Sequence, residues 1–228
     1  MGTMKELGDF RYEIKMVLDE PLVEFAESWV TSNSFGFSPS YPPRRVNNIY
    51  FDTYDRDFLN AHLNGEANRI KIRLRWYGKT WVLDNAQLEI KKKSGNLGEK
   101  IIFPMHSKLD ISKTEWHEVY DLVQNETPEG FQNTLSFCEP IILNYYQRQY
   151  FVSANGAINL TIDNNMRVYD QSTSQFPNLE TLQILRDQII IEFKSSPDNY
   201  SKLADILAEF PLCCSQFSKY LTGCEKLI

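Results

Sequence analysis

Residues 69–78 alternate charged and apolar side chains, and this stretch limits the possible folds of the chain more than any other. Side chains on a β-strand point alternately to its two faces, so one face of such a strand is apolar and the other is cationic. The apolar face holds Ile70, Ile72 and Leu74, and the cationic face holds Arg69, Lys71, Arg73 and Arg75. A single basic strand is usually a solvated edge. Repetition of the pattern favours a different interpretation.

Three further stretches, 11–16, 88–93 and 189–194, also alternate. Their charged faces hold Arg11, Glu13 and Lys15, then Glu89, Lys91 and Lys93, then Glu192 and Lys194. Apolar residues at helical spacing in 22–30, 116–123 and 200–210 predict amphipathic helices that cover the apolar faces. We therefore expect an α+β fold, mainly antiparallel β, in which the sheet closes into a barrel. Its charged face points inward and its helices lie outside.

Such an interior is suited to an anionic ligand. Many cations placed together away from water cost several kcal/mol each unless an opposite charge joins them. Glu13, Glu89, Asp163 and Glu192 are too few to neutralise the cations of the strands. The pattern therefore predicts a polyanion as the ligand.

Composition excludes several other classes of function. The chain of 228 residues has a net charge of -6, which argues against nucleic acid and anionic membranes as partners. No apolar run reaches the roughly 18 residues of a membrane span. The four cysteines form no Cys-x-x-Cys pair, which favours reduced thiols and a cytoplasmic protein. We expect a tail at 1–9 and one domain at 10–228.

Six short motifs in a fixed order resemble a known family. They are Arg-Leu-Arg-Trp-Tyr-Gly (73–78), Leu-Glu-Ile-Lys-Lys-Lys (88–93), Tyr-Gln-Arg (146–148), Thr-Ile-Asp (161–163), Ile-Glu-Phe-Lys (191–194) and Ser-Lys-Tyr (218–220). Together they resemble the VTC domain, the catalytic domain of the vacuolar transporter chaperone polyphosphate polymerase, one of the triphosphate tunnel metalloenzymes. The resemblance implies an eight-stranded antiparallel tunnel that binds a nucleoside triphosphate and polyphosphate with Mn²⁺ or Mg²⁺.

The resemblance also implies roles for individual residues. As catalytic residues it indicates Lys15, Arg73, Arg75, Lys91, Arg148 and Lys219. To phosphate binding we assign Arg11, Lys71, Lys93, Lys100 and Lys194. Glu192, together with Glu13, would hold the metal, because hard divalent cations take carboxylate and phosphate oxygens.

Arg11 departs from the Glu-x-Glu-x-Lys opening that is typical of the hydrolase branch of this superfamily. The exchange of a carboxylate for a cation favours the polymerase branch, with a tripolyphosphatase or nucleoside triphosphatase as the second hypothesis. A binding module that holds polyphosphate without turnover is the third. The phosphate-sensing module and membrane helices of the eukaryotic polymerase are not recognisable here. Regulation, translocation and any membrane-protein partner are left open.

Overall fold

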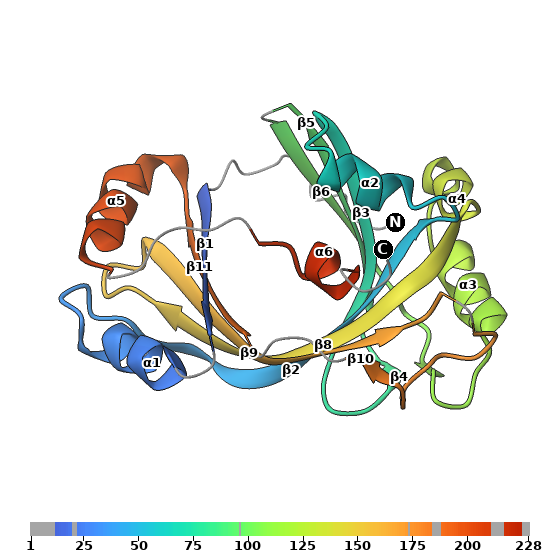
Figure 1. The fold of residues 1–228 in the computed structure, drawn as a ribbon, viewed down its shortest axis with the longest axis horizontal. Helices are drawn as coiled ribbons and strands as arrows, with labels where there is room; N and C mark the ends of the chain where they lie inside the picture. Colours follow the sequence, from blue (N-terminus) through green and yellow to red (C-terminus); the bar gives the residue numbers. More distant parts are fainter. Residues whose placement is uncertain are drawn as a thin grey trace.

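The computed structural model describes residues 12–19, 22–95, 97–172, 174–183, 188–210 and 217–224. A long antiparallel sheet forms the body of the molecule (Figure 1). Its strands are β1 (Tyr12–Asp19), β2 (Ser38–Thr53), β3 (Asn68–Tyr77), β5 (Gln87–Ser94), β6 (Leu97–Pro104), β8 (Cys138–Val152), β9 (Ile158–Asp170), β10 (Leu182–Gln183) and β11 (Gln188–Ser195). A separate two-stranded sheet pairs β4 (Val82–Leu83) with β7 (Leu109–Asp110).

The sheet is an open, curled half-barrel, and the expectation of a closed barrel is corrected here. The strand order is β1-β11-β9-β8-β2-β3-β5-β6, with β10 added beside β9. Within the described residues no ladder joins the two ends, β1 and β6. Backbone closure needs matched tilt and register at both edges. Here side chains face each other across the opening instead: Lys91 Nζ of β5 lies 3.6 Å from Glu13 Oε2 of β1.

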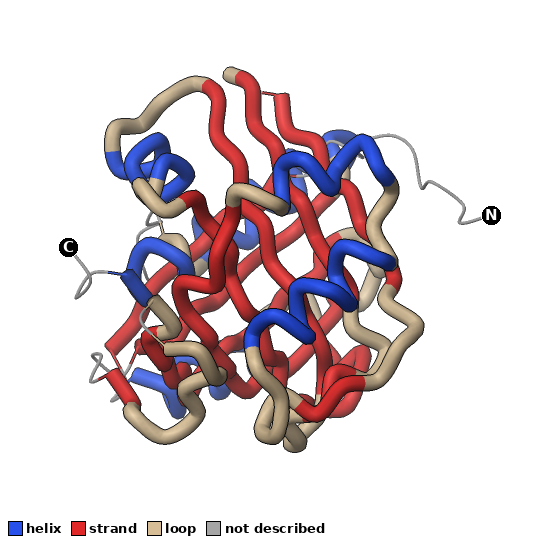
Figure 2. Tube along the Cα trace, turned by 90° about the vertical axis from the view of Figure 1, so that its right-hand side faces the viewer, coloured by secondary structure: helices blue, strands red, loops and turns tan. Residues whose placement is uncertain are grey.

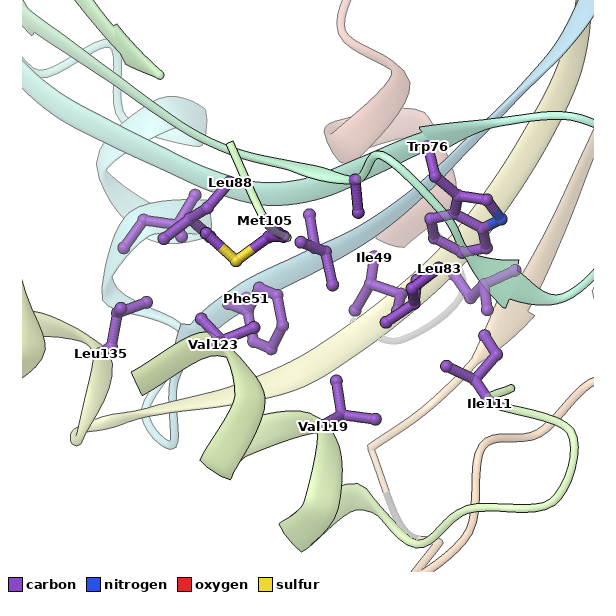
Figure 3. Packing of buried hydrophobic residues seen from close by; sticks show 14 of the residues in the cluster. Ile49, Phe51, Trp76, Leu83, Leu88, Met105, Ile111, Val119, Val123 and Leu135 are labelled. Carbon is purple, nitrogen blue, oxygen red and sulfur yellow. The ribbon is translucent and has the colours of Figure 1, made fainter. Parts of the chain in front are cut away.

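Helices cover the convex face of the sheet, as the apolar periodicity predicts. On one half lie α3 (Trp116–Asn125) and α4 (Glu129–Leu135); on the other lie α1 (Val23–Ser32) and α5 (Tyr200–Glu209), which follows a 3-10 turn at Pro197–Asn199. Figure 2 shows helices lying across the strands, and Figure 3 shows Val123 of α3 beside Phe51 of the sheet. Val119 of α3 and Leu88 of the sheet belong to the same buried cluster. Burial of these apolar side chains stabilises the curled sheet from outside.

Two short helices, α2 (Asp57–Leu63) and α6 (Lys219–Cys224), lie on the other side of the sheet. Figure 1 shows α6 between the two walls of the half-barrel. The Tyr220 hydroxyl donates a hydrogen bond to the buried Asp52 carboxylate, which also accepts from the backbone N–H groups of Phe58 and Leu59. Asp52 thus joins the start of α2 to the start of α6.

β2 begins earlier than the sequence indicates. Consecutive prolines in 38–43 predict a loop, yet the strand starts at Ser38. Its register against β8 shifts between Pro39 and Tyr41 and again between Tyr41 and Arg44. Bulges of this kind accommodate residues that lack a backbone N–H.

Candidate active site

The predicted cations of β3 lie on the face away from the covering helices. Ile72 and Leu74 are fully buried under α3 and α4, so Lys71, Arg73 and Arg75 point to the concave side. The alternation read from the sequence is confirmed for this strand. The register with β5 then decides which charges meet.

Glu89 of β5 is the first point at which these cations converge. It lies directly opposite Arg73 in the ladder and accepts hydrogen bonds from Arg73 Nε at 2.8 Å and Nη2 at 2.5 Å. Arg75 Nη1 and Lys100 Nζ lie 3.5 and 3.2 Å from the same carboxylate. Burial alone would raise the pKa of Glu89, but these three cations lower it to about 2. The carboxylate is therefore ionised and shared.

Neutral side chains complete the surroundings of the two arginines. Arg75 Nε donates to Asn48 Oδ1 at 2.9 Å, and its Nη2 lies 3.2 Å from the Tyr146 hydroxyl. Arg73 Nη1 donates to the Tyr50 hydroxyl at 3.3 Å. The role of these partners was not predicted, although Asn48 and Tyr50 alternate on β2 in the same way as the cations do on β3.

Asp163 of β9 is the second convergence point. Arg148 of β8 forms a forked ion pair with it, through Nε at 2.5 Å and Nη2 at 2.6 Å. Lys219, at the start of α6, lies 2.6 Å from Asp163 Oδ2. Asp163 is fully buried, which would raise its pKa, but Lys219 and Arg148 lower it. Arg148 and Lys219 come from two of the sequence motifs and are 71 positions apart, yet the fold brings both to the Asp163 carboxylate.

Glu192 and Glu13 form the third group, at the β1–β11 ladder. Lys15 Nζ lies 2.6 Å from Glu13 Oε1 and 3.7 Å from Glu192 Oε1, and Lys194 Nζ lies 3.2 Å from Glu192 Oε2. Burial lowers the pKa of Lys15, but Glu192 and Glu13 outweigh it and raise the pKa. The two predicted metal ligands therefore form ion pairs with the same cation, Lys15.

The metal prediction can be tested against this donor set. The described residues contain no cluster of three or more His, Cys, Asp or Glu side chains suited to a metal ion. Two carboxylates near Lys15 still fit a hard divalent cation whose other ligands are phosphate oxygens or water. The residues fit a metal that arrives with a phosphorylated substrate, and do not fit one held by protein alone.

The remaining predicted residues have different environments. Lys91 pairs with Glu13, and Lys100 pairs with Glu89. Lys71 and Lys93 line a cavity of about 280 Å³ beside α2. Arg11 lies outside the described residues. His62, which the sequence favours as a surface residue, and Arg69 line the same cavity.

Comparison with solved structures places this fold in a known class. A protein from Pyrococcus horikoshii OT3 shares 15% identity at a TM-score of 0.52, covering 96% of this chain and 100% of its own. A candidate adenylate cyclase from Bacillus halodurans shares 12% sequence identity at a TM-score of 0.54, and the match covers 94% of this chain and 95% of that protein. A candidate adenylyl cyclase from Hippeastrum shares 14% sequence identity at a TM-score of 0.56, and the match covers 95% of this chain and 96% of that protein. That protein is described as having a dominant triphosphatase activity. At these identities the likeness concerns the fold alone, and the fold is that of the triphosphate tunnel proteins.

The family is established from sequence. The VTC domain matches residues 10–228, so the chain belongs to the VTC domain family. No protein of curated function matches the chain. None of the helices in the described residues is long and apolar enough to cross a membrane.

Proposed function

We propose that this domain is a metal-dependent polyphosphate polymerase that transfers the terminal phosphate of a nucleoside triphosphate to a polyphosphate chain. One observation carries the proposal: each of the four carboxylates described above is shared by at least two cations. A self-neutralised core would pair charges one to one. The surplus of positive charge favours a ligand with several negative charges.

Unpaired polar atoms support the same conclusion. Asn144 Nδ2 and Thr161 Oγ1 are buried without a hydrogen-bond partner in the described part of the chain. Thr161 lies opposite Glu192 in the β9–β11 ladder. Buried polar atoms without a partner are uncommon and are often completed by a ligand. Phosphate oxygens would accept from both groups.

The residues can perform phosphoryl transfer without a covalent protein intermediate. Negative charge builds on the moving group and on the leaving oxygen, and fixed cations stabilise it. Arg73, Arg75 and Arg148 are oriented by their carboxylates and can bond phosphate oxygens in pairs. Lys15 and Lys219 supply point charges at the two sides. A divalent ion held between Glu13, Glu192 and the phosphates would neutralise further charge.

A triphosphatase is the second candidate function, with water in place of the polyphosphate acceptor. The Hippeastrum protein with the same fold favours it through its triphosphatase activity. The two functions use the same cations and differ only in the acceptor. We place either activity in the cytoplasm, which the free, buried thiols of Cys138 and Cys224 support.

Product analysis separates these functions. Purified protein is incubated with ATP and Mn²⁺, with and without a short polyphosphate primer, and the products are followed by gel and by free-phosphate assay. Long chains with little free phosphate are the expected result. Free phosphate without chains would establish the triphosphatase instead, and the absence of both products would contradict the proposal and favour a binding module.

The metal assignment has its own test. Glu192→Gln keeps the shape of the side chain and removes one carboxylate, so the Mn²⁺ concentration for half-maximal turnover should rise about tenfold or more. Binding of tripolyphosphate in EDTA should persist, because the cations remain. Unchanged Mn²⁺ dependence would overturn the role of Glu192.

A further inference from the structure

A cavity of about 280 Å³ lies between α2, β3, β5 and the segment before α6. We call it the carboxylate-free cavity, because none of its lining residues is an acid. Its polar lining is His62, Arg69, Lys71, Lys91, Lys93 and Ser218. Lys91 belongs both to this lining and to the third group, since its Nζ lies 3.6 Å from Glu13 Oε2. The other three cations, Arg69, Lys71 and Lys93, form no ion pair with a carboxylate in the described part of the chain, unlike the cations of the three groups described above.

The strand register concentrates like charges at this cavity. Arg69 lies directly opposite Lys93, and Lys71 lies directly opposite Lys91. Like charges directly opposite each other destabilise a sheet. Two such pairs in succession indicate that the ladder is completed by an anionic ligand.

Two cations of the cavity, Arg69 and Lys71, have no acidic partner in the described part of the chain. Arg69 Nε is buried and has no hydrogen-bond partner in the described part of the chain. The hydrogen bond that Lys71 makes there is to an uncharged group, Ser218 Oγ, at 3.0 Å. Burial, together with Lys15, Lys91, Arg73 and Arg69, lowers the pKa of Lys71 to about 7. The surroundings of Lys71 therefore disfavour its protonated form, and a bound anion would favour that form.

We propose that the carboxylate-free cavity binds the acceptor phosphate chain without a metal ion, next to the centre where the nucleotide reacts. This inference rests on the proposed transferase function. A hard divalent cation bound by protein needs carboxylate oxygens, and none of the lining residues carries one. Cations alone therefore hold the ligand here.

Spacing favours a phosphate chain over a single phosphate. Residues two apart on a strand are separated by about 6.6 Å, so Arg69, Lys71 and Arg73 follow one another along β3 at that interval. The first two belong to the cavity, and the third belongs to the Glu89 group. A chain lying along β3 would pass from the cavity to the reacting centre.

Metal-free binding tests the assignment. Tripolyphosphate and orthophosphate are titrated into the full chain in EDTA by calorimetry. Tripolyphosphate should bind at least about tenfold more tightly than orthophosphate. Equal affinities would overturn the assignment to a chain.

Variants then locate this binding. Lys93→Glu places a carboxylate at the exposed rim of the cavity and should weaken tripolyphosphate binding in EDTA about tenfold or more; Arg69→Gln should weaken it in the same direction. Lys79→Glu is the matched control, because Lys79 is an exposed turn lysine outside the cavity. Binding by both cavity variants as tight as in the wild type would overturn the proposal.

Protonation provides a second readout at the same site. At about pH 8 most of the Lys71 population is neutral, and an anion beside it favours the charged form. Binding should therefore take up close to one proton, measured from the dependence of the binding enthalpy on buffer ionisation. Lys71→Met should abolish this uptake, and its persistence in that variant would contradict the role of Lys71.

Kinetics distinguish a failure of this inference from a failure of the proposed function. In Lys93→Glu the KM for the primer should rise more than the KM for the nucleotide, and an equal rise in both would contradict a separate acceptor site. A wild-type protein that elongates no chain would overturn the polymerase function, and with it the acceptor role. The metal-free titrations would still decide whether the cavity binds a phosphate chain.

Discussion

Arg75 is one of the most enclosed of the predicted catalytic cations, at 7% exposure. Its guanidinium is held by Asn48, Tyr146 and Glu89, which fix its plane before any ligand arrives. Preorganised cations of this kind stabilise charge in the transition state without reorganisation. The catalytic role that we predict for Arg75 therefore depends on the orientation of its guanidinium as much as on its charge.

Replacement of Arg75 should mainly affect turnover. We expect Arg75→Ala to lower kcat by a factor of about 10²–10³, which is typical for the loss of one hydrogen-bond donor to the transition state. Arg75→Lys should recover only part of it, because an ammonium lacks the planar fork. Steady-state kinetics measure both, and Lys79→Ala, in an exposed turn, is the control. Full activity in Arg75→Ala would refute the site.

Glu89 makes the free energy of unfolding depend on pH in the acid range. Its pKa is lowered to about 2 from an ordinary 4.5, so the stabilisation is complete above about pH 4.5 and is lost as the pH falls toward 2. This contribution is on the order of 3 kcal/mol at neutral pH. Urea unfolding at a series of pH values should show a flatter acid dependence for Glu89→Gln than for the wild type. The same pH dependence of unfolding in both proteins would contradict this role of Glu89.

At the scale of elements, α6 decides whether the site is complete. This helix has only six residues and cannot be stable alone. Tyr220 joins it to Asp52, and its neighbour Lys219 reaches Asp163. Gly223 allows the close approach, because a Cβ there would lie 2.5 Å from Ile142 Cδ1. Tertiary contacts therefore hold Lys219, one of the predicted catalytic cations, in place.

Tyr220→Phe removes this connection with little change in shape. Loss of a buried hydrogen bond to a carboxylate should lower the free energy of unfolding by about 1–3 kcal/mol. It should also raise the KM for nucleotide, because Lys219 is less well positioned. Denaturant unfolding and kinetics measure the two effects. Tyr54→Phe, at an 80% exposed position, should change neither; a wild-type KM in Tyr220→Phe would exclude the positioning role.

At the scale of the whole molecule, the half-barrel holds two walls apart with like charges between them. Figure 1 shows β3 and β5 on one side of α6 and β1 and β11 on the other. Lys91 of β5 and Lys15 of β1, two of the predicted cations of these walls, pair with the same carboxylate, Glu13. Repulsion between them should be relieved when a polyanion binds. The molecule is therefore expected to gain stability from its ligand.

Tripolyphosphate should raise the melting temperature strongly. A ligand at one hundred times its dissociation constant adds about 2.7 kcal/mol to the folded state. The gain should shrink with added salt, which screens the charges. Thermal unfolding with sulfate at equal ionic strength is the control. An equal shift with both anions would indicate general screening and argue against a specific phosphate site.

Strand faces were predictable because alternation is a local property. Ile72 and Leu74 face the covering helices, and Arg73 and Arg75 face the opposite side, as period two requires. The VTC motifs located the residues that meet at Asp163 and Glu192. Closure of the sheet was predicted wrongly, because pairing of the edge strands depends on tilt and register over the whole chain.

The sequence by itself determined the alternating strands, the helices that cover their apolar faces and the family. Tertiary structure alone decided which charges share a carboxylate and which do not. Lys71 and Arg73 are two residues apart on one strand, yet only Arg73 meets Glu89, because register places Lys91 opposite Lys71. Ion pairing is set by partners distant in the chain, whereas the face of a strand is set by its own stereochemistry.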